Sequence, residues 1–323
     1  MRIRRAHRDD AAAVGDVIVA AGRAAWRHIF DTSRMRQDAP RWAAMIGDAE
    51  RFWVAEGDDD RIVGFAAAGP ATDAARGPEC GELLMLHVHP DAWGHGVAPR
   101  LHDLALFHLA RSGRREAVLR TEERNHRALA FYARRGWRPD GTALEREFQG
   151  SPLREPWLVR SLDDPDLPRQ RPSGDPDVIA FLEARRTRHV ARDGELLDAA
   201  EFPALTLGEA PRAALTYVVR GPDCEVLTLH AARPRARDGT RLLDALVELA
   251  ADAGCQTVYL TTTNDNLDAL RFYQRRGFRL RAVRPGAVDR SRATVKPQIP
   301  RVGAHGIALR DELELERPVG TAS

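Results

Sequence analysis

One pattern occurs twice in this chain of 323 residues, in the same order and with the same internal spacing. The two copies read Asn125-x-x-Ala128-x-x-Phe131-Tyr132-x-x-x-Gly136 and Asn266-x-x-Ala269-x-x-Phe272-Tyr273-x-x-x-Gly277. Each residue of the first copy lies 141 positions before its counterpart, and the same offset places Gly239 under Ala98. A repeat of this length is too long for a solenoid, so the chain is predicted to hold two similar domains.

The first copy is preceded by a strand-like segment and a glycine loop. The apolar run 83–88 is followed by Trp93-Gly94-His95-Gly96-Val97-Ala98, which predicts a strand, a tight turn and the start of a helix. The first turn of a helix has unpaired N–H groups and a positive dipole end, and glycine lets a phosphate approach the backbone. The loop is therefore predicted to bind a phosphate. The second loop keeps only its last glycine and has Arg235 and Arg237 in place of Gly94 and Gly96.

These residues resemble the motifs of the GNAT superfamily of acyl-CoA-dependent N-acetyltransferases. That family's pyrophosphate loop reads Gln/Arg-x-x-Gly-x-Gly/Ala, and its later helix carries Asn-x-x-Ala-x-x-Phe-Tyr followed by Gly-Phe. The first copy departs from this pattern at Trp93, and the second departs through most of its loop. The resemblance covers most of both halves. It implies an α/β fold with a mixed sheet in each of two tandem GNAT-like domains, acetyl-CoA as cosubstrate, and no metal.

The resemblance also implies which residues hold the cofactor. In the first domain these are Leu86, Val88, Trp93, Gly94, His95, Gly96, Val97, Ala98, Asn125 and Tyr132. A possible second site comprises Gly239, Thr240, Asn266 and Tyr273. Asparagine at a helix start is also a favoured N-cap, which is the alternative role for Asn125. Side chains at Arg235 and Arg237 would crowd a pyrophosphate or contact it directly, and impaired CoA binding is the expectation for the second loop.

Acetyl transfer to an amine needs a base for the ammonium proton and an acid for the leaving thiolate. Tyr132 stands where the family places a tyrosine near the CoA sulfur, so it is the candidate general acid, with a core aromatic as the alternative. Glu82 begins the strand before the loop and is expected on the same face as Leu86, where apolar surroundings would raise its basicity. Glu82 is the candidate base, and His87 and His89 are alternatives.

Composition excludes several other classes. The net charge is +2 and the basic residues are scattered among acidic ones, so we expect no nucleic-acid partner. No apolar run approaches the ~20 residues of a membrane helix, so no membrane association is expected. Three cysteines without metal-ligand spacing indicate buried thiols in a reducing compartment, and the protein is expected to be cytoplasmic. Lys296 is the single lysine in the chain.

The predicted organisation is a first domain at 1–162, a linker at 163–176, a second domain at 177–317 and a tail at 318–323. Four prolines in the linker favour a semi-rigid spacer without helix or sheet. In the second domain we expect a helix at 178–191, as well as a long loop at 284–305 that contains Lys296. A long loop within a compact fold is usually functional or disordered.

The sequence therefore predicts acetyl-CoA-dependent N-acetylation of a small-molecule or protein amine, with the chemistry in the first domain. The second domain would be a degenerate copy that packs against the first or completes its acceptor pocket. One alternative places the chemistry in the second domain, with Glu225 as its acid–base residue and the substrate held by the Lys296 loop. Another is an acyl-CoA-binding or regulatory module without catalysis. The acceptor, the acyl chain length and the oligomeric state stay open.

Overall fold

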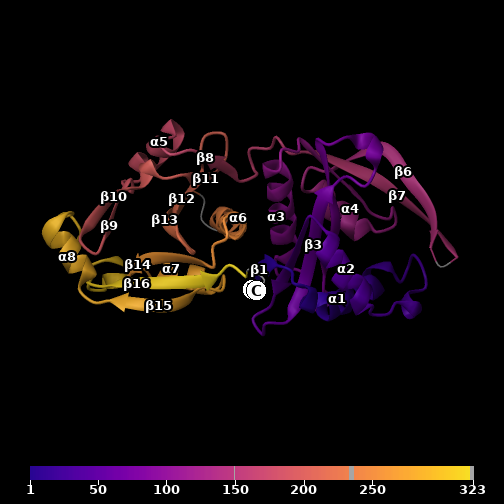
Figure 1. Cartoon of the computed structure of the whole chain (residues 1–323), viewed down its shortest axis with the longest axis horizontal. Coiled ribbons are helices and arrows are strands. Elements are labelled where there is room, and N and C mark those ends of the chain that lie inside the picture. The colour runs from indigo at the N-terminus through magenta and orange to yellow at the C-terminus, as the bar shows by residue number, and fades with distance from the viewer. Residues whose placement is uncertain (149, 233–235, 321–323) are drawn as a thin grey trace. The chain divides into compact units, whose positions relative to one another are not determined.

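The computed structural model describes residues 1–148, 150–232 and 236–320. The chain divides between Leu167 and Pro168 into two compact units, drawn in Figure 1. This division lies inside the predicted linker.

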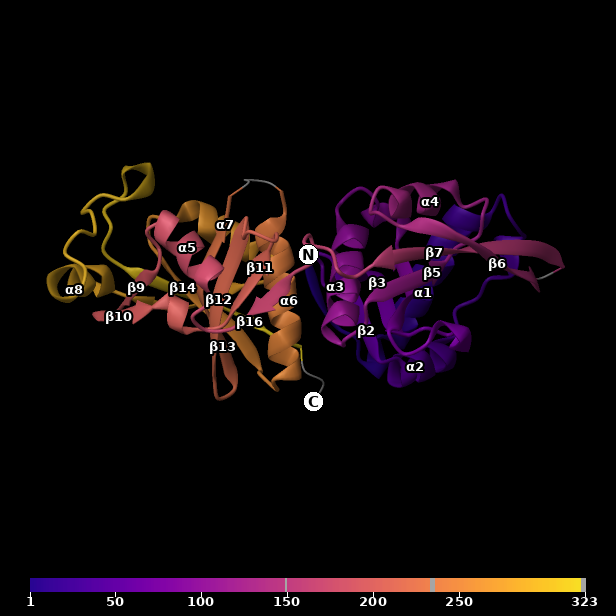
Figure 2. The same ribbon diagram turned by 90° about the horizontal axis from the view of Figure 1, so that it is seen from above.

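The N-terminal unit is a seven-stranded sheet with four α-helices. Its strands are β1 (Arg2–Arg5), β2 (Arg51–Glu56), β3 (Ile62–Pro70), β4 (Cys80–Val88), β5 (Glu116–Arg120), β6 (Arg138–Phe148) and β7 (Ser151–Ser161). Its helices are α1 (Ala11–Trp26), α2 (Ala39–Asp48), α3 (Val97–Arg111) and α4 (His126–Ala133). The strand order is β1-β2-β3-β4-β5-β7-β6, and β4 and β5 are parallel neighbours. Strands β6 and β7 form a long antiparallel hairpin (Figure 2).

The C-terminal unit repeats this topology. Its main sheet contains β8 (Arg169–Arg171), β11 (Ala204–Leu207), β12 (Ala213–Arg220), β13 (Asp223–Ala231), β14 (Thr257–Thr263), β15 (Arg279–Arg284) and β16 (Glu312–Pro318). Its α-helices are α5 (Pro176–Ala184), α6 (Asp238–Asp252), α7 (Leu267–Gln274) and α8 (Ala287–Thr294). The order β8-β11-β12-β13-β14-β16-β15 matches the first sheet strand for strand, with β13 and β14 as the parallel pair. The predicted mixed α/β fold with two tandem copies is confirmed.

The linker prediction is wrong in its middle. Residues 169–171 form β8, which pairs antiparallel with β11 and occupies the place of β1 in the first unit. A short edge strand tolerates flanking prolines because only one of its sides joins the ladder. Pro168 and Pro172 therefore bound this strand instead of preventing it.

The helix predicted at 178–191 is also shorter than expected. Helix α5 ends at Ala184, and Arg186 adopts a left-handed conformation with φ of 55°. The chain then forms an antiparallel hairpin of β9 (His189–Arg192) and β10 (Glu195–Asp198), turning at Asp193 and Gly194. The predicted long loop contains α8, so part of it is regular structure.

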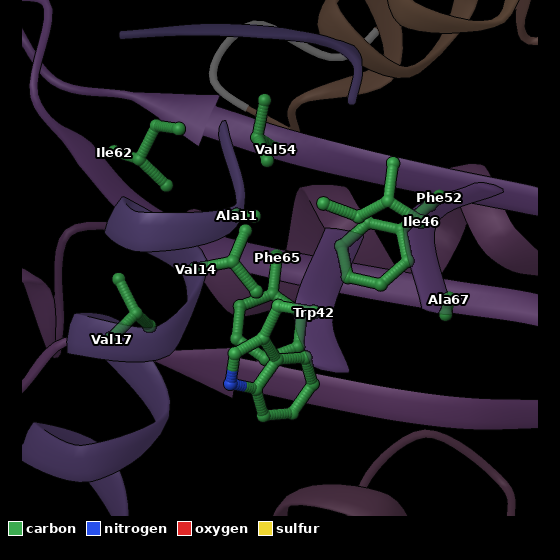
Figure 3. Packing of buried hydrophobic residues seen from close by; sticks show 10 residues of the cluster. All are labelled: Ala11, Val14, Val17, Trp42, Ile46, Phe52, Val54, Ile62, Phe65 and Ala67. Atoms are coloured by element: carbon green, nitrogen blue, oxygen red, sulfur yellow. The ribbon is translucent and has the colours of Figure 1, made fainter. Parts of the chain in front are cut away.

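Helices cover both faces of the N-terminal sheet. On one face Phe65 packs against α1 and α2 in a buried cluster with Trp42 and Phe52 (Figure 3). Successive strand residues point to opposite faces. Gly64, which precedes Phe65, therefore faces the other side of the sheet, where it lies against Val97 of α3. Helix α3 therefore begins directly over the centre of the sheet. All three cysteines are buried and free, as predicted.

Candidate functional site

The parallel strands of each unit separate partway along their length. Strand β4 pairs with β5 only over Cys80–Glu82, and a β-bulge at Leu84 shifts its register against β3. Strand β13 pairs with β14 over Asp223–Val226, and a bulge at Leu227 shifts its register against β12. Beyond these points each strand has backbone groups outside the parallel ladder. The parallel strands therefore separate at equivalent positions in the two sheets.

The glycine loop of the N-terminal unit is shaped to accept an anion. Gly94 and Gly96 have φ of 80° and 84°, and a Cβ at Gly94 would meet no atom within 4 Å. Gly96 is the N-cap of α3. Within the described ranges, the backbone N–H groups of Gly96, Val97 and Ala98 have no hydrogen-bond acceptor. These groups and the positive end of the α3 dipole are open to a ligand.

Trp93 fixes this loop through a hydrogen bond, and an arginine stacks on the Trp93 ring. The Trp93 indole N–H donates to the Val88 carbonyl at 2.8 Å, which ties the loop to the end of β4. The guanidinium carbon of Arg127, on α4, lies 3.2 Å from the centre of the Trp93 ring. Arg127 has no acidic partner among the residues that the structure covers, and burial lowers its pKa. A cation from another helix thus stacks on the residue that stands in place of the motif's Gln/Arg.

Sequence analysis missed Arg127. A signal was present, because the repeat offset places Asp268 at the equivalent position of the second copy. The two units thus carry opposite charges at this point of the corresponding helix.

The start of α6 has the same backbone shape but a different charge. Its N-cap, Arg237, has φ of 66° and ψ of 4°, close to the values of Gly96. The next residue, Asp238, is 3% exposed and forms an ion pair with Arg212 at 3.2 Å. A carboxylate in the first turn already occupies the favourable end of the helix dipole. Arg235 lies outside the described residues.

The other predicted residues of the second loop serve the fold. Gly239 lies inside α6 without a positive φ, where its counterpart is Ala98, so the backbone does not require glycine there. The Thr240 hydroxyl accepts a hydrogen bond from Arg276 Nε at 2.9 Å. Both residues lie in the first turn of α6.

Tyr132 and Asn125 occupy equivalent positions to Tyr273 and Asn266. Tyr132 is 8% exposed, and its ring packs edge-on against Phe131. Burial raises the pKa of both tyrosines, so their hydroxyls stay protonated. Each asparagine caps its helix, with Asn125 Oδ1 accepting from the Ala128 N–H at 3.3 Å and Asn266 Oδ1 accepting from the Ala269 N–H at 3.1 Å.

Glu82 lies in polar surroundings, which differ from those expected. Its Oε2 accepts hydrogen bonds from the Thr72 backbone N–H at 2.7 Å and the Thr72 hydroxyl at 2.6 Å. Its Oε1 lies 3.8 Å from Arg120 Nη2. The bulge at Leu84 also interrupts the strict alternation that placed Glu82 on the same face as Leu86. Glu82 remains at the point where β4 and β5 separate.

The alternative histidines have distinct environments. His87 packs against Trp26 and Phe65, and burial lowers its pKa to about 4, so its ring is neutral at pH 7. His89 Nδ1 accepts from the Asp91 N–H at 3.3 Å and caps a short turn, which is a structural role. His95, in the glycine loop, is exposed.

A cavity of about 380 Å³ lies in the C-terminal unit, where β13 and β14 separate. Strands β13 and β14, the β9–β10 hairpin, α8 and the segment after α8 supply its walls. Asn266, Tyr273 and Lys296 line it, whereas Gly239 and Thr240 do not. The structure therefore separates the four residues of the predicted second site.

In the described ranges no helix is both long and apolar enough to cross a membrane. The same ranges contain no group of three or more His, Cys, Asp or Glu residues that could hold a metal ion.

The two N-caps generate a reciprocal prediction. A left-handed conformation costs a residue with a Cβ ~1 kcal/mol or more relative to glycine. Arg237→Gly should therefore raise the free energy of unfolding, by less than that amount because glycine also loosens the unfolded chain. Gly96→Ala should lower it by about 1 kcal/mol. Urea denaturation of both variants measures these changes. Changes of the same sign in the free energy of unfolding would contradict the left-handed conformation assigned to both N-caps.

Comparison with known proteins gives consistent matches. The sequence profile of the acetyltransferase (GNAT) family matches residues 18–137 and 235–278. The uncharacterized protein YdhI of Bacillus subtilis is 44% identical over 99 residues, which are 31% of this chain and 61% of that protein. The chain thus spans about three fifths of this relative.

A mycothiol acetyltransferase of Geodermatophilus obscurus is 38% identical over 81 residues, which are 25% of this chain and 26% of that enzyme. Among solved structures, the yncA protein of Salmonella typhimurium, determined with its cofactor acetyl-CoA, is 20% identical. That match covers 51% of this chain and 95% of the other, with a TM-score of 0.41.

Proposed function

This chain belongs to the acetyltransferase (GNAT) family, and on that basis we propose that its N-terminal unit transfers an acetyl group from acetyl-CoA to an amine. The acceptor is an amine of a small molecule or a protein. The C-terminal unit, in this proposal, is a copy that has lost the binding of the CoA pyrophosphate.

The contrast between the two helix starts carries the proposal. Both begin with a left-handed N-cap, but Val97 in the first turn of α3 is replaced in α6 by Asp238, a buried carboxylate paired with Arg212. A pyrophosphate carries negative charge, and a carboxylate in the first turn makes the start of α6 less favourable for it than the start of α3. The reversal from Arg127 to Asp268 adds to the same difference.

The N-terminal unit has the parts that a long, bent cofactor requires. The glycine loop and Arg127 receive the pyrophosphate. The edge of β4 beyond Glu82 is free of the parallel ladder, so its backbone groups, including those of Leu86, can pair with the amides of the pantetheine arm. The Val88 carbonyl is already bonded to Trp93 and so contributes by fixing the loop.

In the reaction, the amine nitrogen bonds to the thioester carbonyl carbon, the C–S bond breaks, and CoA leaves as a thiolate that takes up a proton. Tyr132 stays protonated and is placed to donate a hydrogen bond to that sulfur. From ordinary pKa values of about 10 for tyrosine and about 8.5 for a thiol, full proton transfer is uphill by ~2 kcal/mol. Hydrogen-bond stabilisation of the thiolate is therefore the main role of Tyr132.

Glu82 serves as the proton acceptor for the ammonium in this proposal. It lies where β4 and β5 separate, and its Oε2 is fixed by Thr72. Oε1 is directed toward Arg120 at 3.8 Å, a distance beyond that of a direct hydrogen bond. A water at Oε1 can relay the proton from the amine to the carboxylate.

A second candidate places the chemistry in the C-terminal unit. The observation in its favour is the cavity of that unit, which is lined by both Asn266 and Tyr273. In that arrangement Glu225, whose carboxylate accepts a hydrogen bond from Tyr259 at 3.0 Å, is the acid–base residue. Asp238 at the start of α6 argues against CoA binding there, so this candidate ranks second.

The two tyrosines distinguish the candidates. We expect Tyr132→Phe to lower kcat for CoA release by about 10²-fold, through loss of the hydrogen bond to the leaving thiolate, and Tyr273→Phe to leave it unchanged. Free thiol is measured with acetyl-CoA and a panel of polyamines, amino sugars, amino acids and peptides. The reverse pattern would establish the second candidate. Absence of CoA release with every amine, with acetyl-CoA binding intact in both variants, would establish a binding module.

The stacked arginine provides a test of the cofactor site alone. Arg127→Gln removes a cation beside the pyrophosphate and should weaken acetyl-CoA binding about 10-fold, as for a partly exposed charge-assisted contact. Asp268→Asn, the matched change in the second copy, should leave the affinity unaltered. Calorimetric titration measures both. Equal effects of the two changes would show that the charge difference between the units is irrelevant to binding.

A further inference from the structure

The cavity of the C-terminal unit contains a buried carboxyl group with an unused oxygen. Glu312, on β16, is 4% exposed. Its Oε1 accepts from the Asp193 N–H at 3.3 Å, but its Oε2 is buried without a hydrogen-bond partner in the parts of the chain that are described. Leaving a buried carboxyl oxygen unsatisfied is costly, so this atom is suited to receive a donor from a ligand.

The neighbouring acidic residue on the same strand behaves differently. Glu314 is 5% exposed, and its two oxygens lie 3.1 Å from Arg281 Nε and 2.7 Å from Arg284 Nη2. The fold therefore supplies basic partners to one buried glutamate of β16 and leaves the other turned to the cavity.

A cation faces the same cavity. The only lysine of the chain, Lys296, donates from Nζ to the His189 carbonyl at 2.8 Å. No carboxylate among the described residues lies within ion-pair distance of it, and an ammonium group has three donors. Burial and the nearby charge of Arg192 lower its pKa. Lys296 can therefore donate to an acceptor on a ligand.

Two further cations line the cavity: Arg186, which is exposed, and Arg192, on which the charges of Glu225 and Glu312 both act. Arg192 Nε lies 3.6 Å from Glu225 Oε1, and Arg192 Nη2 donates to the Leu227 carbonyl at 3.1 Å. Glu312 and Lys296 line one cavity and do not pair with each other.

The rest of the lining combines apolar side chains and hydroxyls with His189, His230 and Asn266. The apolar and hydroxyl-bearing side chains include Val190, Val226, Leu229, Leu260 and Thr261. Ser291 of α8 accepts from the Gly194 N–H at 3.0 Å, and Arg292 donates to the Ile299 carbonyl at 2.9 Å, so the hairpin and the segment after α8 are tied down. A volume of about 380 Å³ is near the lower end for small-molecule sites.

We propose that this cavity binds a small zwitterion of the amino-acid class, with its ammonium group at Glu312 and its carboxylate at Lys296. The opposite charges satisfy both protein groups at once, and the apolar walls accept an uncharged side chain. The proposal rests on the proposed function, because it requires that the cavity is not the CoA site of the C-terminal unit.

The first test uses the full chain and the common L-amino acids as separate probes. A thermal-shift assay should show at least one amino acid that raises Tm, because a ligand that binds only the folded state stabilises it. Calorimetry with that amino acid should give one site per chain. The matched carboxylic acid without the ammonium, and the matched amine without the carboxylate, should each bind at least 10-fold more weakly.

Variants then locate the site. Glu312→Gln and Lys296→Met should each weaken binding at least 10-fold, whereas Glu314→Gln, on the same strand, should leave it unchanged. Reductive methylation with ¹³C-formaldehyde labels the single lysine and the chain's α-amine, and the Lys296 signal alone should shift when the amino acid is added. This NMR readout reports on the native chain and does not require a variant to fold.

Three results would overturn the proposal. The first is that no amino acid raises Tm. The second is equal affinity for the zwitterion and its two singly charged analogues. The third is competition between the amino acid and CoA for one site, which would assign the cavity to the cofactor.

Discussion

The separation of one parallel strand pair is the constraint on which each unit depends. Where β4 separates from β5, backbone groups of β4 have no partner in the parallel ladder. The bulge at Leu84 bends β4 away from β5. A parallel pair requires a crossover helix, so α3 must start next to this opening. The glycine loop and the free edge of β4 consequently lie at this opening, and our proposal places the hydroxyl of Tyr132 there as well. The same constraint creates the cavity between β13 and β14.

The duplication has kept the backbone and changed the charges. Arg237 adopts the left-handed conformation of Gly96 although its side chain disfavours it, so the turn before α6 is imposed by the surrounding fold. Val97 is replaced by Asp238 and Arg127 by Asp268. In our proposals, one copy retains a site for an anion. The other has a cavity lined by Glu312 and Lys296, which receives a ligand of both charges.

The repeat predicted two similar domains, and the resemblance of its motifs to the GNAT superfamily implied the fold of each. Both depend on helix caps, glycine turns and apolar periodicity, which are local signals. Features that depend on distant partners were not predictable. Residues 169–171 become a strand only because β11 offers an edge, and the Glu82 environment depends on Thr72 and on a bulge that alternation does not reveal. Arg127 and Glu312 were missed because stacking on Trp93 and an unpaired buried oxygen are visible only in three dimensions.

The central claim is that the first loop binds the pyrophosphate and the second does not. Calorimetric titration of acetyl-CoA into the purified chain, read for stoichiometry, tests it most directly. The account predicts one site per chain, abolished by Gly96→Asp, which places a carboxylate at the start of α3, and retained in Gly239→Asp. Two sites, or a single site that is lost in Gly239→Asp and kept in Gly96→Asp, would contradict it.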